Sequence, residues 1–320
     1  MSAESKIAFL FPGQGAQKPG MLARLQRYSA TAHLLDEARD VLAEDPFEFD
    51  TVEAQAGTRA TQLGLLIAGV ASAHLLSGES VVPDFVAGHS VGAFAAAVHA
   101  RVLCFADALR LVDLRGRLMT AAYPRGYGMV AISGMPERTL QGWIDAARAR
   151  GATLHLANRN ASRQFTVSGE DADLAALLEH AQARGAGKAV RLAVAVPSHS
   201  PLMAGVAARM SEAIAEVPLD DARIPFATNR RARMETDGRA IGEDLATGVA
   251  HPVLWHEIVS ALHERGVRTF VETAPGSVLG GLVQATLDDV SMQGSLDEVR
   301  VFAFDRTDAA GLAASSRGAT

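Results

Sequence analysis

The sequence lacks the cysteine content, the long apolar runs and the excess of positive charge that mark three large classes of protein. Its 320 residues include one cysteine, Cys104, so no disulfide can form within the chain. Cys104 lies in the apolar segment 102–105, which predicts a small buried side chain. This usage is typical of a reducing compartment, and we expect a cytoplasmic protein.

The longest apolar stretch, residues 63–76, contains His74 and is shorter than the roughly 20 residues that cross a bilayer as a helix. It predicts a buried core helix. Residues 1–6 lead into only five apolar residues, too few for the apolar centre of a signal peptide. We expect neither a membrane span nor a secretory signal.

A formal net charge of −6 and scattered arginines give no basic face, which a nucleic-acid-binding protein would need. The sequence has no HExxH motif and no cysteine cluster, so we expect no metal site. Hydrophobic residues make up 48% of the chain, enough at this length for a large core.

Strand and helix patterns alternate over most of the chain, which predicts an α/β sheet. The predicted strands are residues 7–11, 85–87, 224–227, 268–272 and 301–304. The predicted helices are residues 28–43, 59–77, 91–100, 105–121, 252–265 and 277–287.

Residues 127–196 follow a different order, β-α-β-β-α-β, which is that of the ferredoxin-like unit. The predicted strands here are 127–133, 153–157, 164–168 and 189–196, and the predicted helices are 136–150 and 171–184. We therefore expect a large α/β domain from residues 1–126 and 197–307, an inserted small domain at 127–196, and a frayed tail at 308–320.

The pentapeptide Gly88-His89-Ser90-Val91-Gly92 has the pattern GxSxG between a predicted strand and a predicted helix rich in small residues. A serine on such a turn is held with its hydroxyl exposed, as a nucleophile requires. The N–H of Val91 and the start of the helix would then face the oxyanion that forms when Ser90 attacks an acyl carbon. The alternative interpretation is an ordinary tight turn.

His199 is the candidate base for this serine, because a serine at its own pKa is a poor nucleophile. It lies in Val196-Pro197-Ser198-His199, where the predicted small domain returns to the large one, and substrates bind in clefts between domains. The other histidines have simpler interpretations. Solvent-facing helices are predicted for His33, His180 and His263, core or helix-end positions for His74 and His99, and a direction away from Ser90 for His89.

Arg115 falls within the apolar stripe of the predicted helix 105–121, so it is expected to point inward. The opposite, polar face carries Arg110, Asp113 and Arg117. A buried guanidinium is costly unless an anion meets it. Either an internal ion pair or a snorkelling side chain would satisfy this need, or Arg115 binds the carboxylate of a substrate.

Seven motifs in their order along the chain carry a resemblance. They are Phe11-Pro12-Gly13-Gln14-Gly15, Gly88-His89-Ser90-Val91-Gly92, Leu114-Arg115-Gly116, Asn158-Arg159-Asn160, Pro197-Ser198-His199, Pro252-Val253-Leu254-Trp255 and Ala274-Pro275-Gly276. Over residues 7–280 the chain resembles the malonyl-CoA:acyl-carrier-protein transacylases. The resemblance implies an α/β-hydrolase-like large domain with a ferredoxin-like small one.

By matching position, the resemblance implies a Ser90–His199 dyad, an oxyanion site at Gln14 and Val91, and Arg115 on the malonyl carboxylate. Gln62 and Asn160 are further candidates for substrate binding. The implied substrate is malonyl-CoA, the acceptor is the thiol arm of an acyl carrier protein, and no bound cofactor is expected.

Two departures from the family pattern bear on the biological role. The elbow continues as Val91-Gly92-Ala93-Phe94, where members of fatty-acid synthesis typically read GHSLGEY. With Tyr127-Gly128-Met129, this is similar to the transacylase (epsilon) subunit of malonate decarboxylase, whose small carrier subunit would be the partner. The alternative is a transacylase of fatty-acid or polyketide synthesis.

The second departure is Gly248, where the family usually has Gln or Asn. Its main-chain carbonyl can still orient the catalytic histidine, whereas any contact of that side chain is lost. Two other classes stay open: a serine thioesterase or hydrolase, which normally has a carboxylate behind the histidine, and a non-catalytic carrier-docking subunit. The expected docking rim for the carrier comprises Arg159, Arg163, Arg230, Arg231 and Arg233.

Overall fold

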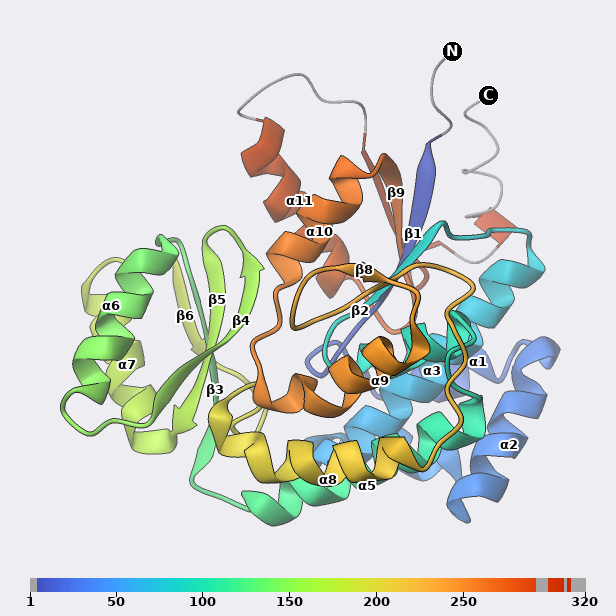
Figure 1. Ribbon diagram of the computed structural model, residues 1–320, viewed down its shortest axis with the longest axis horizontal. Coiled ribbons are helices and arrows are strands. Elements are labelled where there is room, and N and C mark those ends of the chain that lie inside the picture. Colours follow the sequence, from blue (N-terminus) through green and yellow to red (C-terminus); the bar gives the residue numbers. More distant parts are fainter. Residues whose placement is uncertain (1–4, 292–298, 308–309, 312–320) are drawn as a thin grey trace.

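Two β-sheets, one of six strands and one of four, organise the chain in the computed structural model, which describes residues 5–291, 299–307 and 310–311 (Figure 1). Figure 1 shows the four-stranded sheet with its two helices at the left, while the larger sheet has helices on both of its faces. This is the predicted α/β architecture.

The six-stranded sheet has the order β10-β9-β1-β2-β7-β8, and every neighbouring pair is parallel except β7 and β8. In that order its strands are Arg300–Ala303, Val267–Glu272, Lys6–Phe11, Phe85–Gly88, Phe226–Ala227 and Met234–Glu235. Because β1 and β2 are parallel neighbours, the loops that follow Phe11 and Gly88 leave the same edge of the sheet.

Strand β1 is buried on both faces, because helices cover both sides of the sheet. Phe9 and Phe11 lie in the larger apolar cluster, and Ala8 and Leu10 in the second. The helices packed in the larger cluster are α1 Met21–Leu25, α2 Ala32–Leu42, α3 Thr58–Gly78, α4 Gly92–His99, α5 Phe105–Ala122, α8 Ala204–Ala215 and α9 Gly238–Thr247. Those in the second are α10 Trp255–Glu264 and α11 Val278–Ser291.

Helix α3 is the single helix among the described residues that is long and apolar enough to cross a membrane. Within the protein, 78% of its most apolar window is buried, so its apolar residues are accounted for by the core. The predicted core helix is confirmed, although His74 lies on its exposed side.

The four-stranded sheet is antiparallel and has the order β4-β5-β3-β6. Along the chain its elements are β3 Tyr127–Ser133, α6 Glu137–Arg148, β4 Leu154–Ala161, β5 Gln164–Glu170, α7 Asp171–Ala183 and β6 Lys188–Arg191. It has its own apolar cluster, which includes Val130, Leu140, Phe165 and Leu177. The main chain also joins it to the large unit, because the N–H of Arg159 donates to Val253 O at 2.9 Å.

Several predicted boundaries are wrong. Strand β6 ends at Arg191 instead of residue 196, so an irregular segment leads to His199.

Cys104 is exposed rather than buried, because its Sγ caps α5 by accepting the N–H of Asp107. The predicted tail at 308–320 lies outside the described residues except for 310 and 311. Helices α1, α8 and α9 and strand β8 were not assigned from the sequence.

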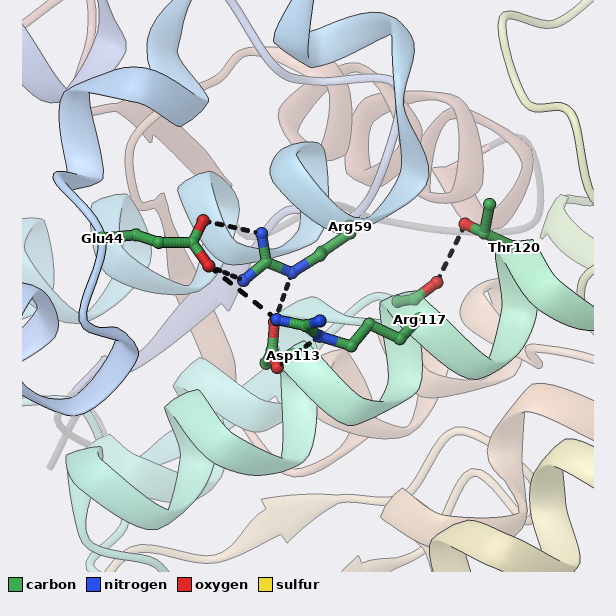
Figure 2. A network of polar contacts seen from close by, with 6 residues as sticks. Glu44, Arg59, Asp113, Arg117 and Thr120 are labelled. Atoms are coloured by element: carbon green, nitrogen blue, oxygen red, sulfur yellow. Dashed lines mark hydrogen bonds and ion pairs between the residues drawn. The ribbon is translucent and has the colours of Figure 1, made fainter.

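The polar face of α5 is tied to its neighbours by ion pairs, as Figure 2 shows. Arg59 of α3 pairs with Glu44 at 2.7 Å and with Asp113, which Arg117 also contacts at 2.8 Å. The two helices approach closely at Gly116, where a Cβ would lie 2.6 Å from the Cα of Arg59.

Replacing Gly116 with Ala is expected to lower the free energy of unfolding by about 1–3 kcal/mol, because the methyl group overlaps the Arg59 backbone. The matched control is Gly142→Ala in helix α6, where a Cβ meets no atom within 4 Å. That change should raise the free energy of unfolding, by up to about 1 kcal/mol. Urea unfolding monitored by circular dichroism measures both, and a neutral result for Gly116→Ala would contradict the close approach.

Candidate active site

Ser90 occupies a sharp turn between strand β2 and helix α4. Its φ of 54° lies in the left-handed region, which a non-glycine residue adopts at a cost of about 1–3 kcal/mol. Both flanking glycines are required: a Cβ at Gly88 would lie 2.2 Å from Ala93 N, and one at Gly92 would lie 2.1 Å from Phe11 O. The elbow therefore packs directly against the end of β1.

The loop after β1 lies beside the serine. A Cβ at Gly13 would lie 2.4 Å from His89 O, so Gln14 is brought close to Ser90 and shares a cavity with it. Among the described residues, no acceptor takes the main-chain N–H of Val91 or of Gln14. Both residues line one cavity with Ser90, which makes these N–H groups candidate donors to a negative oxygen there.

His199 is held between the serine and two main-chain carbonyls. Its Nε2 lies 2.7 Å from Ser90 Oγ, while its Nδ1 lies 2.8 Å from Gly248 O and 3.1 Å from His251 O. Because carbonyls only accept, Nδ1 carries the proton and Nε2 accepts the hydroxyl hydrogen of Ser90. Burial and then the charge of Arg115 lower the pKa of His199 to about 3, which keeps the imidazole neutral.

Arg115 points inward, as predicted, and is only 3% exposed. Its Nη2 donates to Ser90 Oγ at 3.4 Å, and no carboxylate of the described residues pairs with it. Burial lowers its pKa to about 10, so it remains charged at neutral pH. The alternative of an internal ion pair is not observed, because the nearby Asp113 is turned to the polar face of α5.

A cavity of about 50 Å³ lies beside these groups, between residues of the four-stranded sheet and residues of the loops and helices around the six-stranded one. Its lining residues are Gln14, Gln62, His89, Ser90, Val91, Arg115, Met129, Asn158, Thr166, Leu192, Val194, Ser198 and His199. One cavity thus holds a serine with a neutral histidine beside it, two N–H groups without an acceptor among the described residues, and a buried cation. Such a set of groups can carry out acyl transfer through a serine ester. Among the described residues, no group of three metal-ligating side chains occurs.

Comparison with known proteins agrees with this chemistry. The acyl transferase domain family matches residues 8–306. The chain belongs to this acyltransferase family. It is 37% identical over 286 residues, 88% of the chain and 90% of the relative, to a malonyl CoA-acyl carrier protein transacylase of Bacillus subtilis. It is 35% identical over 293 residues, 90% of the chain and 94% of the relative, to that of Staphylococcus aureus strain MRSA252.

Solved structures of the family share the fold. FabD from Acinetobacter baumannii matches with a TM-score of 0.90 at 31% identity, over 99% of this chain and 100% of that one. A malonyl-transacylase, solved with a type II PKS acyl-carrier protein, matches with a TM-score of 0.85 at 31% identity, over 93% and 95% of the two chains.

Of the two predicted substrate-binding residues, Gln62 and Asn160, the first lines the cavity and the second does not. Gln62 is 1% exposed and lines the cavity. Its Nε2 lies 3.4 Å from Met119 Sδ, and its Oε1 has no partner in the described part of the chain. Asn160 does not line the cavity, because its amide contacts His89 at 3.1 Å and Thr166 at 3.2 Å. Asn158, two residues earlier on β4, reaches the cavity instead.

The expected docking rim is partly neutralised. Arg159 pairs with Glu137 at 2.8 Å, and Arg230 pairs with Glu243 at 2.6 Å. Arg163 donates to Gly134 O at 2.7 Å. Arg231 and Arg233 are exposed and, among the described residues, make no ion pair.

Asn229 and Asp244 near Ser90 were missed from the sequence. Asn229 follows the end of β7, the parallel neighbour of β2, and polar side chains at this edge of an α/β sheet often belong to a site. That position was the one available signal. Asp244 lies inside helix α9 with no sequence pattern to distinguish it.

The low pKa of His199 gives a testable pH dependence. A neutral fluorophosphonate should modify Ser90 at a rate that stays high well below pH 6.5, because the imidazole remains an acceptor down to about pH 3. In Arg115→Ala one cause of the lowered pKa is gone, so the acid limb should move to higher pH. Rates from pH 4 to 8, with folding checked by circular dichroism, test this, and a limb at 6.5 in both proteins would contradict it.

Proposed function

We propose that this acyltransferase moves a malonyl group from malonyl-CoA to the thiol of an acyl carrier protein through a malonyl ester of Ser90. The observation that carries the proposal is the unpaired guanidinium of Arg115, buried 3.4 Å from a serine that is hydrogen-bonded to His199. The names of the relatives support the same substrate.

In the first half-reaction, Ser90 Oγ attacks the thioester carbonyl while His199 Nε2 takes its proton. The N–H groups of Val91 and Gln14 stabilise the oxyanion. The C–S bond then breaks, and the proton on His199 passes to the sulfur of CoA. The carbonyls of Gly248 and His251 hold the imidazolium in place, because its Nδ1–H continues to donate to them.

In the second half-reaction, the carrier thiol gives its proton to His199 and attacks the malonyl ester. The C–O bond breaks and Ser90 recovers the proton. The same two groups therefore serve both directions, and no cofactor takes part in this scheme.

Selection of a diacid follows from Arg115. A malonyl carboxylate would pair with the guanidinium through two charge-assisted hydrogen bonds. An acetyl group would leave the cation buried and unpaired, which makes the binding of monoacids unfavourable. Gln62 and Asn158 also line this cavity, and their amide oxygens have no partner among the described residues, so they can accept a hydrogen bond from an N–H group of the CoA or carrier arm.

A serine hydrolase is the rival class with the same nucleophile. It normally orients its histidine with an Asp or Glu, whereas His199 is oriented by two carbonyls. A non-catalytic docking subunit would have no need for the contact between Ser90 and His199. We also infer that residues 127–196 are the inserted ferredoxin-like domain, whose strands β3–β5 supply Met129, Asn158 and Thr166 to the cavity.

The carrier of fatty-acid or polyketide synthesis is the favoured acceptor, because the similar proteins are FabD-type transacylases and one was solved with a polyketide carrier. The elbow sequence Val91-Gly92-Ala93-Phe94 is the observation that favours the malonate decarboxylase carrier as second candidate.

Arg115→Ala should change substrate preference instead of reducing all rates equally. Malonyl transfer should fall by about 100-fold or more, because the lost bidentate pair is worth roughly 3 kcal/mol or more. Acetyl transfer should stay equal or rise. Initial rates with both thioesters measure this, with Ser90→Ala as the inactive control. A parallel loss of both rates in a folded variant would make Arg115 a structural residue.

The carrier is tested by offering each candidate to the malonyl-enzyme. We expect kcat/KM for the fatty-acid-type holo-carrier to exceed that for the decarboxylase carrier subunit by at least about tenfold. Charge reversal at the exposed Arg231 and Arg233 should weaken transfer to the preferred carrier at low salt, where charge attraction acts over a longer range. The reverse preference would assign the protein to malonate decarboxylase.

A further inference from the structure

Asn229 spans the nucleophile elbow with both ends of its amide. Its Oδ1 accepts the main-chain N–H of Ser90 at 2.9 Å, and its Nδ2 donates to Gly88 O at 2.7 Å. The side chain is 4% exposed, so these bonds do not compete with water. One residue thus binds the backbone on both sides of His89.

Asn229 contacts the elbow at the point where the pairing between β2 and β7 ends. Strand β7 pairs with β2 only at Val86 and Ala87, and β2 ends at Gly88. Strand β1 still pairs with Gly88 on the other side, but Gly88 O and Ser90 N–H lie beyond the pairing with β7. The amide of Asn229 replaces the missing main chain, and it does so where Ser90 adopts a positive φ.

Asp244 fixes Asn229 in turn. Its Oδ2 accepts the N–H of Asn229 at 2.7 Å, and its Oδ1 accepts the N–H of Arg230 at 3.0 Å. Asp244 lies on α9, and the residue that follows this helix, Gly248, gives the carbonyl that holds His199. The anchor of Asn229 and the carbonyl that orients His199 therefore lie at the same end of the chain segment that forms α9.

We propose that Asn229 is a positioning residue for Ser90, with Asp244 anchoring it, and that together they keep Ser90 Oγ within reach of His199. The Asn229 bond also occupies the Ser90 N–H, which leaves the Val91 and Gln14 N–H groups as the oxyanion donors. The inference rests on the proposed function only in taking Ser90 as the nucleophile.

The first test is Asn229→Ala with a neutral fluorophosphonate, which reports the reactivity of Ser90 without malonyl-CoA or a carrier. We expect modification to slow by roughly 10- to 100-fold, because two buried hydrogen bonds to the elbow are lost. In malonyl transfer, kcat should fall while KM changes little, since Arg115 is untouched.

The matched control is Thr228→Val. Thr228 is 6% exposed in the same loop, and within the described part of the chain its hydroxyl bonds only to the main chain of Arg233, at 3.1 and 3.2 Å. Loss of the hydroxyl therefore disturbs the loop but not the elbow. We expect a lower melting temperature and an unchanged rate of Ser90 modification.

Asn229→Asp gives a signature that a general loss of packing would not produce, and it stands if Asn229→Ala fails to fold. An ionised carboxylate can accept from Ser90 N–H but cannot donate to Gly88 O, whereas the protonated acid can do both. The rate of the variant relative to the native protein should therefore rise as pH falls from 8 to 5, in samples that circular dichroism shows to be folded.

Native rates in folded Asn229→Ala and Asn229→Asp, or equal slowing in Thr228→Val, would overturn the inference. A flat pH ratio for Asn229→Asp would remove the role of the donated bond to Gly88 O. If the native protein transferred no malonyl group but Asn229→Ala still slowed Ser90 modification, the proposed function would fail and the positioning role would stand.

Discussion

The candidate site depends on the guanidinium of Arg115, which is buried and has no counter-ion among the described residues. Taking such a charge out of water costs on the order of several kcal/mol, which the surrounding fold has to supply. Arg115 can stay there because helix α5 is fixed on both faces. Apolar residues hold its inner face, and Glu44, Arg59, Asp113 and Arg117 tie its outer face to neighbouring segments.

The same charge sets the chemistry of its neighbours. It contacts Ser90 and contributes to the low pKa of His199, so the free enzyme holds a neutral base beside a polarised hydroxyl. An incoming carboxylate would cancel the charge and thereby raise the basicity of His199 when the substrate is in place. On the proposed function, binding of a diacid acyl group would therefore also raise the basicity of His199.

The sequence predicted the features that depend on local patterns. The glycines of the GxSxG turn, the inward direction of Arg115 and the alternation of strands and helices are all encoded within short segments. The order of helices and strands in residues 127–196 could also be predicted, since each helix and strand there has its own periodicity.

Features that depend on distant contacts were not predictable. Asn229 reaches the elbow across 139 positions of sequence, and its neighbours give no pattern. Asn158 and Asn160 belong to one motif on β4, whose register with β5 is irregular here, and the motif does not show which of them lines the cavity. Cys104 looked like a core residue because its neighbours are apolar, yet its place before a helix made it a cap.

Orientation of the base by Gly248 has a consequence for how this enzyme tolerates change. The hydrogen bond uses a carbonyl at φ −54° and ψ −30°, a conformation open to almost any amino acid. The tautomer of His199 is therefore fixed by the backbone conformation at position 248 and does not depend on which side chain stands there. Because a Cβ at position 248 would meet no atom within 4 Å, a change of side chain there would leave the hydrogen bond to His199 in place.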